Sequence, residues 1–300
     1  MSEAPFTRVG VRPIPPPRLK TRPWYEGRPV LSCAVLAVIL LGCLFCEAFI
    51  PKDPAYMDLY HASTPPGGGF WLGTDAMGRD IFSMIWYGGR ISLSIGFLAT
   101  LVSTLLAVLF GAASGLSPRW LDGMLMRLTE IFLSIPSLLL IVLLQAVWGK
   151  AGVISLSLVI GATSWTGVAK VVRTEVRQLR SCGYVIAARC MGAGFFRILR
   201  RHLLPNFLSS ILFMVVMNVR GAIAAESTLS FLGLGLPLEV ISWGSMLSLS
   251  EKALLSGAWW VILPPGIVLV VTMVCLTDIG NYLRRAAGRH SLHMGHPAAQ

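Results

Sequence analysis

The sequence predicts an all-α, polytopic membrane protein with six transmembrane helices. Of its 300 residues, 55% are hydrophobic and 13% are charged, and the mean hydropathy is +0.70, whereas soluble proteins average about 25% charged residues. A soluble fold has nowhere to place this much apolar surface, so the solvent for most of the chain is a bilayer. The net charge of +11 does not indicate a nucleic-acid partner, because Lys and Arg collect on the cytoplasmic loops of membrane proteins.

The order of polar and apolar segments predicts five regions. Residues 1–29 are basic and proline-rich, which favours a cytoplasmic tail. Residues 30–50 form an apolar run long enough to cross the hydrocarbon, and we expect a retained signal anchor. Residues 51–90 are rich in Gly, Pro and Trp and form an extracytoplasmic connection. Residues 91–285 hold a core of five more transmembrane helices, and residues 286–300 form a cytoplasmic tail that contains histidines.

The five apolar runs of the core each have the length of a membrane helix. The first of them contains Gly111 and Gly115, a small-xxx-small pattern that lets another helix approach closely. The runs lie at approximately 91–116, 131–148, 151–172, 207–225 and 259–280.

The distribution of basic residues predicts the orientation. If the N-terminus is inside, the cytoplasmic segments together with Lys170 hold nineteen of the 25 basic residues. The positive-inside rule therefore places both termini in the cytoplasm. The loop at 173–206, which we call the coupling segment, then also faces the cytoplasm.

The coupling segment combines arginines with small residues. Arg173, Arg177 and Arg180 are spaced to share one face of a helix, and arginines here are expected to contact anionic lipid headgroups. Small side chains permit a partner to approach closely, so we expect Gly192→Trp to block docking of a partner without preventing insertion. Composition alone favours an ordinary positive-inside loop.

The spacing within the coupling segment carries a family resemblance. The segment reads "YVIAARCMGAGFFRILRRHLLPN", with Ala187-Ala188, then Gly192, then Leu204-Pro205. This resembles the EAA motif in membrane subunits of ATP-binding-cassette importers, although Ile186 and His202 depart from the general pattern. In that family the motif forms a short coupling helix that docks on the ATPase subunit. The resemblance implies that the coupling residues are Tyr184, Ala187, Ala188, Arg189, Gly192, Ala193, Leu204 and Pro205.

Four other stretches resemble the peptide and nickel branch of the same family. They read "WLGTDAMGRDIFSMIWYGGRISLSIG", "RLTEIFLSIPSLLL", "ESTLSFLGLGLPLEVISWGSML" and "LPPGIVLVVTMVCLTDIGNYLRR". The likeness covers nearly all of residues 30–285, with differences at Glu130, Asn281 and Arg285. It implies the type I importer permease fold.

The resemblance also implies the partners and the location. These are a second homologous permease, two ATP-binding subunits, an extracytoplasmic substrate-binding protein and the lipids of the bacterial inner membrane. The chain has no G-x-x-x-x-G-K-[ST] sequence, so ATP and Mg²⁺ are expected on the partner ATPases, with no cofactor in this chain. We expect a transport subunit and not an enzyme, with di- or oligopeptides as substrate and nickel or a metal chelate as the alternative. An ion-coupled secondary transporter is a rival of another class, but the mid-span positions are nearly free of carboxylates.

Three groups of polar and flexible residues are candidate sites. The first group forms an expected clamp that holds the outer connection, and we favour this interpretation over a metal site. Its residues are Asp75, Arg79 and Asp80. The pathway or gate candidates include an intramembrane charge and a glycine-rich turn. We expect Arg220 and Glu226 to form an ion pair. The full set of candidates is Asn218, Arg220, Glu226, Phe231, Gly233 and Gly235. In the C-terminal tail, His290, His293 and His296 are candidate metal ligands, although such a short tail is usually unstructured.

Overall fold

The computed structural model describes residues 29–67, 69–149, 152–237, 239–249, 253 and 257–294, with side chains up to residue 287. Every regular element within these residues is a helix, in agreement with the predicted all-α class. Three helical stretches are long and apolar enough to cross a membrane, and two bent helix pairs raise that number to five if each pair is one span. The remaining predicted span, at residues 30–50, corresponds to the shorter helix α1.

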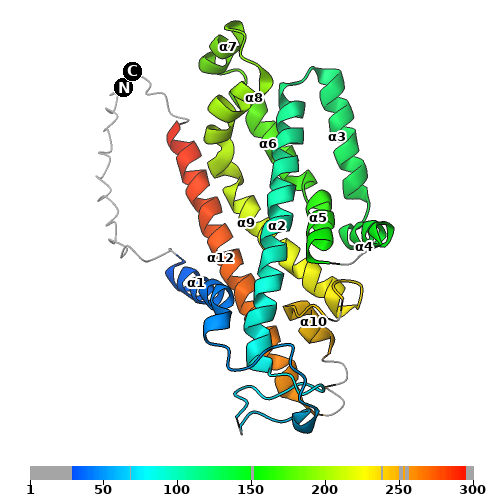
Figure 1. The fold of residues 1–300 in the computed structure, drawn as a ribbon. Coiled ribbons are helices and arrows are strands. Elements are labelled where there is room, and N and C mark those ends of the chain that lie inside the picture. The colour runs from blue at the N-terminus through cyan, green and yellow to red at the C-terminus, as the bar shows by residue number, and fades with distance from the viewer. Residues whose placement is uncertain are drawn as a thin grey trace, which may run out of the picture.

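Helix α2 (Ile81–Leu116) is the centre of the molecule and packs against α5, α6 and α9 (Figure 1). It begins ten residues before the apolar run at 91 because Asp80 caps it: the Asp80 carboxylate accepts hydrogen bonds from the backbone N–H and the hydroxyl of Ser83, at 2.9 and 2.6 Å. Within its first turns, Gly89 packs so closely that a Cβ there would lie 2.7 Å from the Trp243 ring. Gly89 therefore serves as a packing surface inside the helix.

The third apolar run is not one straight span, contrary to the sequence prediction for 131–148. Helix α3 (Arg119–Ser134) and helix α4 (Ser137–Trp148) meet at 93°. Pro136 stands between them, and the preceding Ile135 is extended (φ −94°, ψ 129°). The proline ring disfavours the helical conformation for the residue before it, which breaks the helix at this point.

The fourth apolar run, predicted at 151–172, is also bent. Helix α5 (Val153–Thr163) and helix α6 (Thr166–Leu179) meet at 48°. At the bend, the hydroxyls of Thr163 and Ser164 both donate to the Ile160 carbonyl, at 2.9 and 2.8 Å. Such bonds compete with the backbone ladder and favour bending.

The coupling segment leads into a long helical path. Helix α7 (Gly183–Cys190) is followed by α8 (Phe195–Ile198), a π-helical turn (Leu199–Leu203) and α9 (Leu204–Phe231). Pro205 lies in the first turn of α9, a position typical of a proline that opens a helix, and the helical path continues from 195 to 231. The wider π turn places the missing proline N–H where the backbone hydrogen-bond pattern already changes.

The remaining helices complete one flank and the end opposite α7. Helix α1 (Val30–Leu44) packs on α12 (Leu263–Met294), and the six-residue α10 (Trp243–Ser248) packs on α9. At 15 residues, α1 is shorter than the approximately 20 residues that cross the hydrocarbon. Three short helical turns lie at Cys46–Ala48, Leu59–His61 and Trp259–Val261.

The two small residues Gly111 and Gly115 make the close contact that the sequence predicted. A Cβ at Gly111 would lie 2.6 Å from the Ala169 carbonyl oxygen, and one at Gly115 would lie 2.7 Å from Val176. Helices α2 and α6 therefore touch backbone to backbone at the end that carries α7. This close packing joins the coupling segment to the central helix.

Candidate functional site

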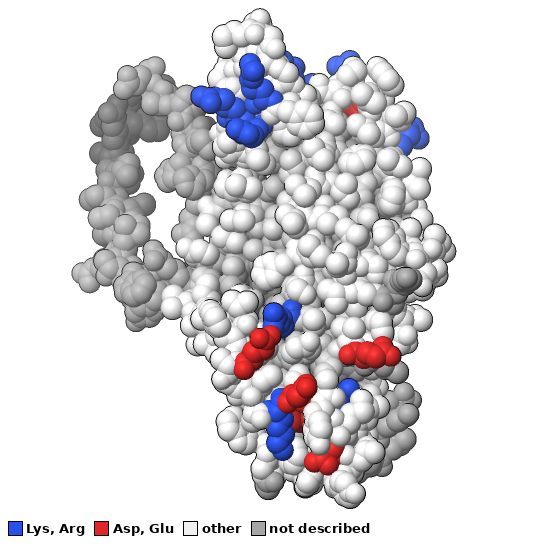
Figure 2. All heavy atoms as spheres, viewed as in Figure 1, with Lys and Arg blue, Asp and Glu red and all other residues white. Residues whose placement is uncertain are grey.

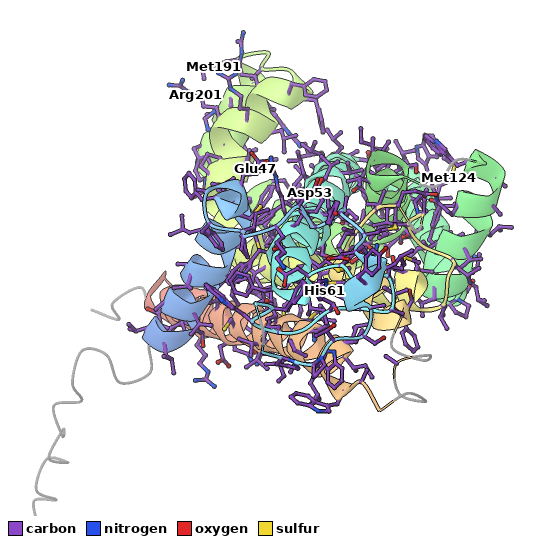
Figure 3. The ribbon with its side chains drawn as sticks, turned by 60° about the horizontal axis from the view of Figure 1, so that its bottom comes forward. Glu47, Asp53, His61, Met124, Met191 and Arg201 are labelled. Atoms are coloured by element: carbon purple, nitrogen blue, oxygen red, sulfur yellow. The ribbon has the colours of Figure 1, made fainter. Side chains whose placement is uncertain are left out.

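The coupling segment stands at one end of the molecule, with α7 outermost, and the connection between α1 and α2 lies at the opposite end (Figure 1). Figure 2 shows Lys and Arg side chains gathered at the α7 end, while acidic side chains gather toward the other end. In Figure 3 the labelled Met191 and Arg201 lie together at that end, far from Asp53 and His61.

Helix α7 has one buried and one exposed face. Val185 and Ala188 are buried, and Val185 packs in a hydrophobic cluster with residues of α2, α6 and α9. Tyr184, Ala187 and Arg189 are exposed. The two alanines of the motif thus differ: Ala187 is available to a partner, whereas Ala188 fixes the helix to its own chain.

The end of α7 explains Gly192 in a way that the sequence did not predict. Gly192 has φ +77°, its N–H donates to the Arg189 carbonyl at 2.9 Å, and the Ala193 N–H donates to the Ala188 carbonyl at 3.0 Å. This is the Schellman pattern, in which a left-handed residue closes the helix. Gly192→Trp therefore strains the backbone besides adding bulk, so it is a poor test of docking.

The two remaining motif residues lie where the segment joins α9. Leu204 is half-buried and Pro205 is exposed, both in the first turn of α9. The Tyr184 and His202 rings lie side by side, with centroids 6.0 Å apart. The motif residues are thus divided between α7 with its Schellman turn and the start of α9.

Asp122 is a central residue of this end that sequence reasoning missed. Its buried carboxylate on α3 receives two hydrogen bonds from Arg173, one of them at 2.7 Å, and one each from Arg177 and Ser114. Arg180 donates to the Gly115 carbonyl at 3.1 Å. Two of the arginines assigned to lipid contact thus form a partly buried ionic tie between α3 and α6. The only sequence signal was an acidic residue between Arg119 and Arg127.

Glu226 lies at the centre of a second polar cluster, which we call the serine cage. Its side chain is fully buried in α9 and accepts hydrogen bonds from four hydroxyls, at 2.7 to 3.3 Å: Ser92, Ser227, Ser230 and Ser242. The cage links α2, α9 and the start of α10. The expected pairing with Arg220 is wrong, because Arg220 is exposed on another face of α9.

The other pathway candidates fall into two groups. The Asn218 side chain donates to the Ser103 hydroxyl at 3.3 Å, and a Cβ at Gly235 would lie 2.4 Å from the Ser230 oxygen; both therefore pack inside the chain. Phe231 and Gly233 are exposed, as is Arg220. Gly233 has φ +74°, so it closes α9 in a left-handed turn.

The three residues of the predicted outer clamp are buried but do different things. Arg79 Nε and Nη2 lie 2.8 and 2.7 Å from Asp75 Oδ2, while the other Asp75 oxygen accepts the backbone N–H groups of Met77 and Arg79. Asp80 caps α2 instead. Next to them, Gly78 has φ +75°, and a Cβ there would lie 1.8 Å from the Asp58 carbonyl oxygen.

The candidate metal ligands of the tail are not part of the described structure. His296 and the side chains of His290 and His293 lie outside the described residues. Among the residues that are described, no group of three or more His, Cys, Asp or Glu is placed to hold a metal ion.

Comparison with known proteins agrees with this architecture. The family described as "binding-protein-dependent transport system inner membrane component" matches residues 103–289. The chain is 36% identical over 258 residues to the dipeptide transport system permease protein DppC of Bacillus subtilis, covering 84% of this chain and 80% of that protein. It is 36% identical to the oligopeptide transport system permease protein OppC of the same organism (86% and 84% covered). It is 33% identical to the di/tripeptide transport system permease protein DppC of Pseudomonas aeruginosa (84% of each).

The helical spans, the coupling segment and these likenesses agree with one another. The chain is a multi-pass membrane permease subunit and belongs to the family of inner membrane components of binding-protein-dependent transport systems.

Proposed function

We propose that this chain and a second, similar permease form the translocation pathway of an importer for di- or oligopeptides. The observation that carries the proposal is the likeness, over more than four fifths of the chain, to permeases named for dipeptide, oligopeptide and di/tripeptide transport. Nickel or a metal chelate is the second candidate, but the names of these relatives favour peptide. Membership in a family of binding-protein-dependent systems speaks against an ion-coupled secondary transporter.

The exposed face of α7 docks on a separate ATPase subunit. Tyr184, Ala187 and Arg189 are exposed, and the small Ala187 leaves room for a partner groove. Ala188 and Val185 hold the helix from behind. Both termini and α7 are then cytoplasmic, two ATPases lie beneath the permease pair, and ATP and Mg²⁺ bind to those ATPases.

Movement of α7 reaches the spans through two contacts. The first is the hydrophobic cluster around Val185, which contains residues of α2, α6 and α9. The second is the ionic tie of Asp122 to Arg173 and Arg177, which makes α3 follow α6. A closing motion of the ATPases therefore acts on a packed body, and alternation between inward-open and outward-open states is a rigid-body change. ATP drives it by favouring one of the two states.

The exposed face of α9 lines the pathway. It carries Arg220, and at its outer end Phe231 and the Gly233 turn are exposed. A charged side chain at membrane depth is costly unless it meets water or a partner. The substrate-binding protein delivers the peptide to the outer end, where the clamp of Asp75 and Arg79 holds the connection in place.

Uptake of a labelled peptide tests the function. Cells that express the chain with its partner subunits are measured under an uncoupler with ATP maintained, and again with ATP depleted. We expect uptake to depend on ATP, and an excess of unlabelled peptide to compete where a nickel chelate does not. Uptake that collapses with the proton gradient and ignores ATP would contradict the proposal.

Ala187→Trp tests the docking face. It adds bulk on the exposed side of α7 without changing a backbone conformation, so the ATPase should no longer co-purify while the isolated chain melts as before. Met124→Trp is the matched control, since Met124 is 59% exposed on α3 and lies away from Met191 (Figure 3). Gly192→Asn, which tolerates a left-handed conformation, should keep docking. Normal co-purification of the ATPase with Ala187→Trp would refute the assignment.

A further inference from the structure

A recess with three arginines lies beside the coupling helix. It has a volume of about 820 Å³ and is lined by Phe196, Arg197, Arg200, Arg201 and Pro205; we call it the arginine recess. Arg197, Arg200 and Arg201 have the i, i+3, i+4 spacing that places side chains on one face of a helix. All three are exposed.

The positive charge of the recess is not neutralised within the described residues. Arg173 and Arg177 are held by Asp122, but the three recess arginines have no ion-pair partner among the residues that the structure describes. Guanidinium groups present forked donors that match the oxygens of a phosphate. The recess therefore fits a ligand with a phosphate group.

The position of the recess next to the start of α9 favours a membrane lipid as the source of that phosphate. Arg201 precedes Leu204, the first residue of α9, by three residues, which is about 4.5 Å along a helix. The apolar run predicted for this span begins at residue 207, about 9 Å along a helix from Arg201. The headgroup layer on each side of a bilayer is about 5–8 Å thick, and the long arginine side chains can reach it from there. Phe196, which is 72% exposed, supplies apolar surface beside the charges. Helix α7 lies farther out (Figure 1), and the basic patch appears on the flank of the molecule (Figure 2).

We propose that the arginine recess binds the phosphate headgroup of an anionic phospholipid of the inner leaflet. The bound lipid would hold the π turn and the start of α9 against the membrane, next to the helix that moves with the ATPase. This inference does not depend on the substrate, so it stands or falls separately from peptide transport.

Lipid retention by the purified full chain tests the proposal. Native mass spectrometry counts phosphatidylglycerol bound to the chain in mixed micelles, with phosphatidylcholine as the neutral comparison. Each basic residue near an anionic surface contributes about a fivefold increase in affinity. The double variant R200Q/R201Q should therefore bind phosphatidylglycerol about 25-fold more weakly, and R200K/R201K should fall between it and the native chain because lysine lacks the forked donors.

The control removes the same charge elsewhere on the same end. Arg119 and Arg127 are exposed on α3, so R119Q/R127Q should change phosphatidylglycerol binding less than twofold. Size-exclusion profiles and melting temperatures verify that each variant is folded. Equal losses in the two double variants would show diffuse charge attraction and overturn the proposal.

Two further outcomes would also overturn it. If R200Q/R201Q loses binding of inorganic phosphate but keeps phosphatidylglycerol, the recess binds a soluble phosphate and not a lipid. If R200Q/R201Q retains phosphatidylglycerol but loses the co-purifying ATPase, the recess belongs to a protein interface.

Discussion

The serine cage yields a prediction with a calculable magnitude. Glu226→Ala removes the acceptor of four buried hydroxyls in a single step. A buried hydroxyl that loses its acceptor costs about 1 kcal/mol, so the four together cost about 4 kcal/mol. The void left by the side chain adds to this loss. At about 2 °C per kcal/mol for a large chain, the melting temperature should fall by about 8 °C.

A second variant separates the hydrogen bonds from the void. Glu226→Gln keeps one oxygen for Ser230 and Ser242, and its amide nitrogen replaces the oxygen that faces Ser92 and Ser227. Because a hydroxyl can rotate and accept, this variant should lose less than half as much stability as Glu226→Ala.

The assay is thermal unfolding of the purified chain in lipid nanodiscs, followed by tryptophan fluorescence. Glu130→Ala is the matched control, because Glu130 is exposed on α3, and it should melt within about 1 °C of the native chain, as exposed substitutions usually do. If Glu226→Ala melts with the control, the cage does not stabilise the fold. If it also abolishes uptake at native stability, Glu226 is a pathway residue instead.

Three further predictions follow from single contacts. Asp122→Asn should lower the free energy of unfolding by about 1–3 kcal/mol, because the charged carboxylate that pairs with the two arginines of α6 is lost. A melting curve measures this, with Glu130→Gln as the control. Equal melting curves for the two variants would contradict the ionic tie. Gly78→Ala should loosen the outer connection, because its Cβ would overlap the Asp58 carbonyl, and limited proteolysis should then cleave within residues 51–80. Gly69→Ala shares the positive φ but meets nothing within 4 Å, so equal cleavage in both variants would assign the effect to backbone strain alone. Cys190, exposed on α7, should react with a membrane-impermeant maleimide in inside-out vesicles when it is the only cysteine left; labelling in intact cells would reverse the proposed orientation.

The sequence was sufficient for those features that depend on local composition and spacing. Apolar runs locate the spans because the bilayer requires a continuous apolar length. The spacing from Ala187 to Pro205 was enough to predict a coupling segment because all of its residues belong to one stretch of chain. The close contact at Gly111 and Gly115 was also predictable, since small residues four apart lie on one helix face. The bends at Pro136 and Ser164 were not assigned, although Pro136 carried a local signal.

Only the tertiary structure decided which residues meet across the fold. Asp122 pairs with arginines 51 and 55 residues away, and Glu226 accepts from Ser92 across 134 residues; no local pattern encodes such pairs. Likewise, the different roles of Ala187 and Ala188 depend on which face of α7 the rest of the chain covers. Local sequence determines where helices form, but the burial of a side chain depends on how the helices assemble. Burial in turn determines whether a charged side chain forms an internal ion pair, accepts hydrogen bonds from buried hydroxyls, or stays exposed to a partner.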